Sequence, residues 1–178
     1  NAVARSTEQQ LRDTLATHRA LVDAAASPDP AGSILRLLAE RLDSWAAILD
    51  PTGAVDHAQP ADFREFAPVM QREVKKLGAA GVHSVASITT PDGVIVLYPL
   101  AVRKRIVGYV AVRTEQQLDA SQRAIVLTAC TLLALDASKT TAEESADLAR
   151  RQSVALLIED GHVAQAHGLV ARIGLRTL

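Results

Sequence analysis

Apolar residues recur along the chain at two different periods, and the change from one period to the other outlines its elements. Up to Leu42 they follow three- and four-residue spacings, which predicts a helix over residues 5–26 and a second helix after it. Between them lies Ser27-Pro28-Asp29-Pro30. Asp29 can cap the second helix and Pro30 suits its first turn.

Short apolar runs then predict a pair of strands and a third helix. Residues 45–49 and 54–57 flank the turn Asp50-Pro51-Thr52-Gly53, which has proline and glycine where a tight turn uses them. The next helix is expected to begin near Asp62 and to end at the glycines that follow residue 77. Its predicted apolar face carries Phe63, Phe66, Val69, Met70 and Val74.

Three linked strands are predicted over residues 82–89, 94–98 and 106–112. Pro91-Asp92-Gly93 provides the first turn between them and Arg103-Lys104-Arg105 the second. Strands joined by such short turns form an antiparallel meander.

The pattern becomes helical again from Asp119, which is spaced from Gln122 as in a capping box. The apolar run 124–137 is expected to be strongly buried. Thr141 could cap a fresh helix, so we expect either a kink near Lys139 or one long helix. The whole order contains no βαβ unit, which predicts an α+β fold with an antiparallel sheet flanked by helices.

Composition narrows the class of protein. The 178 residues are 48% hydrophobic but only 3% aromatic, so aliphatic side chains must supply most of the core. A net charge of −1 gives no long-range attraction to DNA or anionic lipid. With no run of 18 or more apolar residues and no secretory signal, we expect a cytoplasmic protein that does not cross a membrane.

Several strings in this order resemble those of a GAF domain, a relative of PAS domains. Residues 48–53 resemble the first hairpin of that family, and Tyr98-Pro99-Leu100 followed by residues 106–112 resembles its central strand pair. Residues from Asp119 onward resemble its closing helix. The resemblance implies a sensory domain with long N- and C-terminal helices.

The C-terminal part resembles the junction found in regulators of the PucR/CdaR type. Residues 151–161 and 167–175 are similar to the place where a GGDEF-like domain follows the GAF-like domain, ahead of a helix-turn-helix. The resemblance implies DNA binding only through domains missing from this chain. It divides the chain into a dimerisation helix over 3–29, a sensory domain over 30–118, a signalling helix over 119–160 and the start of the next domain over 161–178.

In the GAF family a small-molecule cavity lies between the sheet and the helix or loop after the early strands. The resemblance therefore selects the aromatic side chains and their polar neighbours as candidates for binding an effector, with plain core packing as the alternative. They are Trp45, Phe66, Met70, His83, Tyr98 and Tyr109.

The terminal helices carry apolar stripes that exceed what one small domain needs to bury, which is typical of an interface. We expect them to pair across a two-fold axis, with intramolecular packing as the alternative. The predicted interface residues are Leu11, Leu15, His18, Val22, Ala142, Ala146, Ala149 and Leu156.

No catalytic constellation, metal site or cofactor motif is predicted. The five histidines are scattered, and Cys130, the one cysteine, lies in an apolar run typical of a buried structural thiol. Arg103-Lys104-Arg105 could bind an anion, but fits a solvated turn better. We expect a non-enzymatic sensory and dimerisation domain of a transcription regulator. The alternatives are an input domain of a kinase or phosphatase, or a small enzyme on the same fold.

Overall fold

The computed structural model describes residues 2–60 and 67–159. Two compact units are recognised, one ending at Ala137 and the other beginning at Ser138, and each is described by itself. The elements in chain order are α1 (Ala2–Ala25), α2 (Pro30–Leu42), β1 (Ala46–Leu49), β2 (Val55–Gln59), α3 (Ala67–Ala80), β3 (Ala86–Thr90), β4 (Gly93–Val102), β5 (Arg105–Thr114) and α4 (Ala120–Glu159).

The first unit is built on a five-stranded sheet in the order β2-β1-β5-β4-β3, and every neighbouring pair is antiparallel. β5 is the central strand. Its Val112 lies opposite Ala46 of β1 on one side and Val96 of β4 on the other. The predicted α+β class with an antiparallel meander is confirmed.

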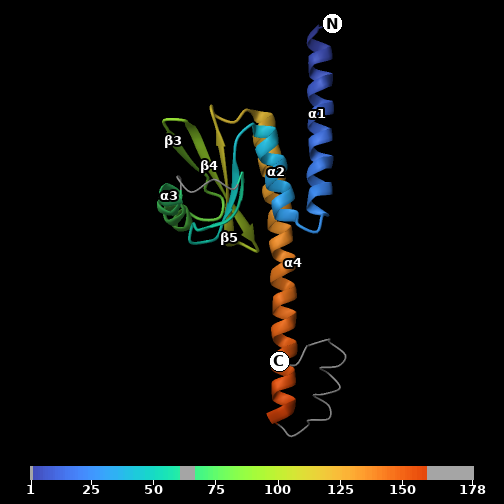
Figure 1. Cartoon of the computed structure of the whole chain (residues 1–178), viewed down its shortest axis with the longest axis vertical. Helices are drawn as coiled ribbons and strands as arrows, with labels where there is room; N and C mark the ends of the chain where they lie inside the picture. Colours follow the sequence, from blue (N-terminus) through green and yellow to red (C-terminus); the bar gives the residue numbers. More distant parts are fainter. Residues whose placement is uncertain (1, 61–66, 160–178) are drawn as a thin grey trace. The chain divides into compact units, whose positions relative to one another are not determined.

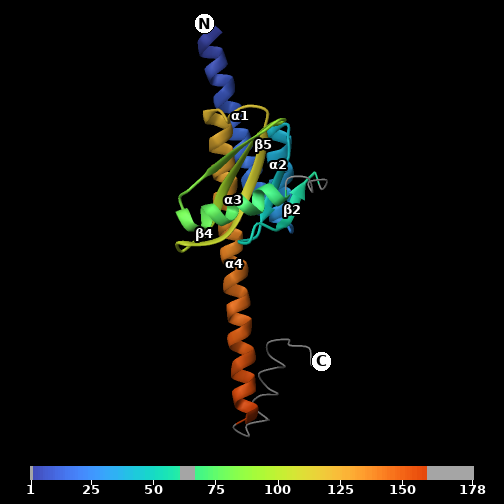
Figure 2. The same cartoon turned by 90° about the vertical axis from the view of Figure 1, so that its left-hand side faces the viewer.

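Helices cover both faces of this sheet. α3 packs on one face, whereas α2 and the first part of α4 pack on the other (Figures 1 and 2). α1 lies alongside α2 and buries Leu21 in the same core. Each face therefore has its own apolar core, and the alternation of side chains along a strand decides which core a residue joins.

Local hydrogen bonds place the helix starts where the sequence predicts them. The Asp29 carboxylate accepts from the Gly32 amide at 3.0 Å and caps α2, with Pro30 in its first turn. At α4, the Gln122 amide donates to the Asp119 carboxylate at 2.8 Å, and the Gln122 side chain accepts from the Asp119 amide at 3.1 Å. This reciprocal pair is the predicted capping box.

Helix α4 is continuous from Ala120 to Glu159, so of the two alternatives at Lys139 the single long helix is correct. Its apolar run is only half buried, contrary to expectation. Val126 and Leu133 are buried, but Leu127 and Leu135 are 49% and 54% exposed. The sheet covers only one side of this helix, whereas apolar residues occur around its whole circumference, so some of them remain exposed.

One predicted strand boundary is wrong, and one predicted helix start lies outside the described residues. β3 begins at Ala86 rather than at Val82, because Ser84 donates its amide to Gly81 and its hydroxyl to Ala80, which holds this stretch in a turn. The predicted start of the third helix near Asp62, with Phe63 and Phe66, lies outside the described residues, as do residues 161–178.

By length and composition α4 is also able to cross a membrane over Ala120–Gln152, where its most apolar 18-residue window has a mean hydropathy of 1.3. A core helix of a soluble protein passes the same test. One such helix is weak evidence for a membrane span. Ile125, Val126 and Ala129 pack against the sheet, but only 28% of the apolar window is buried.

The turn between β1 and β2 makes a pH-dependent contribution to stability. The Asp50 carboxylate accepts from the Thr52 hydroxyl and amide, both at 2.7 Å, and from the Ala54 amide at 2.9 Å. The Thr52 hydroxyl has the largest effect and lowers the pKa of Asp50 below its ordinary value of 3.8; burial opposes it, and the backbone amides lower the pKa further. The ionised carboxylate is thus favoured in the folded chain.

We expect Asp50→Ala to be less stable than the wild-type chain at neutral pH. Because the folded pKa is lowered, the contribution of Asp50 is present above the unfolded pKa, and the gap should close as the pH falls through the folded pKa. Urea unfolding of both chains at a series of pH values measures this difference in stability, with Asp56→Ala on the exposed strand β2 as a control. A gap that stays constant into acid would contradict this account.

Candidate functional site

The face of the sheet under α3 holds three of the side chains predicted to bind an effector. Trp45, Met70 and Tyr109 share one apolar core there, together with Leu49 and Leu97 of the sheet. Met70 is completely buried and Tyr109 is 1% exposed. Most of this face is therefore filled by packed side chains.

A hollow of about 410 Å³ opens at one end of this core, where α3 ends near the β4–β5 turn. Tyr109 forms part of it, Gly78 and Gly81 come from the end of α3, and Lys104 comes from the turn. Within the part of the chain that the structure describes, the Tyr109 hydroxyl has no hydrogen-bond partner. Burial raises the pKa of Tyr109, so it stays a neutral donor at neutral pH. The hollow thus offers a phenol and an ammonium group to a ligand.

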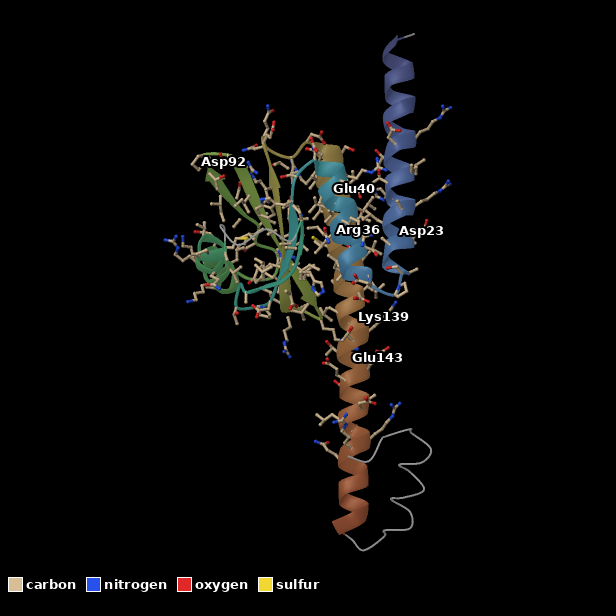
Figure 3. All side chains as sticks on the ribbon, in the orientation of Figure 1. Asp23, Arg36, Glu40, Asp92, Lys139 and Glu143 are labelled. Atoms are coloured by element: carbon tan, nitrogen blue, oxygen red, sulfur yellow. The ribbon has the colours of Figure 1, made fainter. Side chains whose placement is uncertain are left out.

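A second hollow of about 510 Å³ lies between the end of α2 and the ends of β1 and β2. Its lining includes Arg36 and Glu40, which Figure 3 labels on α2, together with Trp45 and Arg113. The Arg113 guanidinium donates to the Asp92 carbonyl, but its Nε is buried with no partner in the described structure. Charges of both signs surround this hollow, so it has no clear preference for an anion or a cation.

The six predicted effector-binding residues do not gather in one place. Tyr109 and Trp45 line the two different hollows, and Met70 is sealed in the core. Tyr98 lies on the opposite face of the sheet, and His83 is exposed in the segment before β3. Phe66 lies outside the described residues. That these side chains bind an effector stays a prediction.

Cys130 is buried in the core on the α4 side of the sheet, as predicted for a structural thiol. Burial raises the pKa of the thiol to about 12, which leaves it protonated and unreactive at neutral pH. Among the described residues, no three His, Cys, Asp or Glu side chains come together in a way that could hold a metal ion.

The outer helices expose the faces that were predicted to pair. On α1, Leu15 is 54% and Val22 is 56% exposed, and His18 between them is half-buried. On α4, the predicted stripe of Ala142, Ala146 and Ala149 is exposed. The side chains of Leu11 and Leu156, the other two in this predicted interface, are among those whose placement is not described.

Sequence reasoning did not single out the exposed leucines of α4, which are Leu127, Leu135 and Leu148. Of these, Leu135 lies seven residues before Ala142, on the same face of the helix. The signal was available in the heptad spacing of Leu135 and Ala142. It was hidden by the apolar residues on every side of this helix.

No protein-family model and no curated protein sequence matches the chain. Solved structures do match. The GAF domain of a phosphoenolpyruvate-protein phosphotransferase from Acinetobacter has a TM-score of 0.54 at 13% identity, over 72% of this chain and 94% of its own. The GAF domain of a protein assigned as a sensor histidine kinase from Pseudomonas syringae pv. tomato has a TM-score of 0.53 at 14% identity, over 82% of this chain and 99% of its own.

Both neighbours are covered almost completely, so the likeness extends over a whole GAF domain rather than one shared motif. At this level of identity it shows the fold and nothing finer. The antiparallel sheet with α3 on one face and α2 and α4 on the other is therefore a GAF-like α+β fold, as the sequence resemblance implied.

Proposed function

We propose that this chain is a dimeric signalling input domain, and specifically the sensory and dimerisation domain of a PucR/CdaR-type transcription regulator. In this proposal DNA is contacted by other domains of the regulator, because the near-neutral charge of this chain supplies no electrostatic attraction to phosphates. The domain is a soluble cytoplasmic one and carries out no catalysis itself.

The observation that carries this proposal is the exposed apolar surface of α1 and α4. Leu15 and Val22 on one helix, and Leu135 on the other, are about half exposed. Apolar residues at regular helical spacing on an outer face are typical of a protein–protein interface. A second copy of the chain is the simplest occupant, because it presents the same faces.

An effector is proposed to bind on the α3 face, in the hollow beside Tyr109 and Lys104. A ligand there would contact the end of α3 and the β4–β5 turn at once. If it binds one arrangement of the dimer better than another, it shifts the population between them, and α4 transmits the change.

The same surfaces would also serve an input domain of a kinase or phosphotransferase. The two structural neighbours come from proteins of these kinds, so this second candidate is favoured by an observation of its own. Both candidates require the dimer.

We expect the chain to be a dimer in solution and Leu135→Glu to weaken it by about 100-fold or more in Kd, because the change places a carboxylate in an apolar interface. Leu15→Glu on α1 should act in the same direction. Analytical ultracentrifugation over a range of concentrations measures both.

Leu148→Glu is the matched control. Leu148 is on the same helix with 58% exposure, but thirteen residues from Leu135 and so on another face. It should leave the dimer intact. A wild-type chain that stays monomeric at high micromolar concentration, or equal effects of the two variants, would refute the proposed interface.

A further inference from the structure

A third hollow lies on the face of the sheet away from α3, between β4 and the start of α4. Its volume is about 170 Å³, and its lining includes Tyr98 and Val96 of β4, Arg123 of α4 and Gln117 of the segment between β5 and α4. It is separate from the hollow beside Tyr109, because Tyr98 and Tyr109 belong to the two opposite cores.

Tyr98 is the first reason to expect a ligand here. The residue is only 6% exposed, yet its hydroxyl has no hydrogen-bond partner within the described part of the chain. Its ring belongs to the core, but the hydroxyl is not one of the fully buried atoms without a partner, so it is accessible to a ligand. Burial, and to a lesser extent the neighbouring Cys130, raise the pKa of Tyr98, while Arg123 opposes them. The hydroxyl is therefore a neutral donor on a residue that lines the hollow, with the Arg123 cation close enough to affect its pKa.

Arg123 is the second reason. Its guanidinium donates to the Leu118 carbonyl at 3.1 Å, and no carboxylate lies within ion-pair distance of it in the described residues. A guanidinium has five N–H donors, so most of them are left for another acceptor. Arg123 is the one charged residue lining this hollow, which gives it a net positive character.

The remaining walls limit the size and kind of the acceptor. Val94, Val96 and Leu118 line the hollow with apolar surface, and Ser87 and Gln117 add polar groups to it. Its volume corresponds to about five or six water molecules at about 30 Å³ each, which suits an organic acid with a short hydrocarbon chain. A fully hydrated inorganic anion would leave the apolar walls without contacts.

We propose that this hollow binds a short-chain carboxylate, which accepts hydrogen bonds from the Tyr98 hydroxyl and the Arg123 guanidinium and packs its hydrocarbon end against Val94 and Val96. Arg123 is in the first turn of α4. The bound anion thus joins this turn to the central part of the sheet. The site does not depend on the effector hollow or on the dimer.

Propionate is the probe, and its binding to the whole chain is measured by NMR chemical-shift titration. We expect saturable binding that Tyr98→Phe and Arg123→Gln each weaken by about tenfold or more, since each removes a donor to a charged acceptor. Tyr98→Phe keeps the core filled, and Arg123 is at an exposed rim, so both variants should remain folded. Arg72→Gln makes the same change of charge at an exposed position of α3, on the other face of the sheet, and should bind as the wild type does.

Three results would overturn the assignment. They are a wild-type chain that shows no saturable shift with propionate, a Tyr98→Phe variant that binds it as well as the wild type, and inorganic phosphate that binds as tightly as propionate. A chain that binds propionate but does not form a dimer would contradict only the function proposed above, and not this site.

Discussion

Leu133→Asp is expected to lower the free energy of unfolding by about 4 kcal/mol or more, which is enough to unfold a domain of ordinary stability. Leu133 is 4% exposed and belongs to the core between α4 and the sheet. The change removes an apolar side chain from that core and puts a carboxylate in its place, and none of the buried residues that the structure describes is a cation that could pair with it. Circular dichroism in increasing urea measures the loss.

Two comparisons make the test specific. Leu148→Asp introduces the same charge on the same helix at an exposed position and should change stability by less than about 1 kcal/mol. Leu133→Asn should be less damaging than Leu133→Asp at neutral pH. The two should converge in acid, because burial raises the pKa of the new carboxyl group and the penalty is lost once the group is protonated. Equal effects at Leu133 and Leu148 would show that α4 does not pack on the sheet through this face.

The order and type of the elements follow from local signals in the sequence. The caps at Asp29 and Asp119 and the turn at Asp50 are local hydrogen-bond motifs, so neighbouring residues are enough to define them. Burial of α4 is different. An apolar run such as 124–137 does not show how much of its circumference the sheet covers, and Leu127 and Leu135 were therefore expected to be buried.

The candidate site was harder to predict because it depends on strand register. Tyr98 lies opposite Val110 across β4 and β5, so Tyr98 shares a face with Val110 and not with its neighbour Tyr109. Side chains alternate along a strand, and a shift of one residue in this pairing would place both tyrosines on the same face. The register cannot be read from the sequence, and the prediction therefore placed both tyrosines in one cavity.

The turn that precedes β4 provides the second large expected effect: Gly93→Ala should cost about 3 kcal/mol. Gly93 has a φ of +139°, a conformation that residues with a side chain rarely adopt. A Cβ at this position would also lie 2.3 Å from the Thr114 carbonyl oxygen of β5. Relief of that contact requires the hairpin to move away from the central strand.

Gly81→Ala separates the two causes. Gly81 has a φ of +99°, but a Cβ there would meet no atom within 4 Å, so only the backbone strain remains, at about 1 kcal/mol. The larger cost expected for Gly93→Ala in urea unfolding therefore includes the steric contact with Thr114, in addition to the backbone strain at its own φ. If both substitutions cost the same, this turn does not approach Thr114 as closely as the fold requires, and the alignment of β4 with β5 that separates Tyr98 from Tyr109 would have to be redrawn.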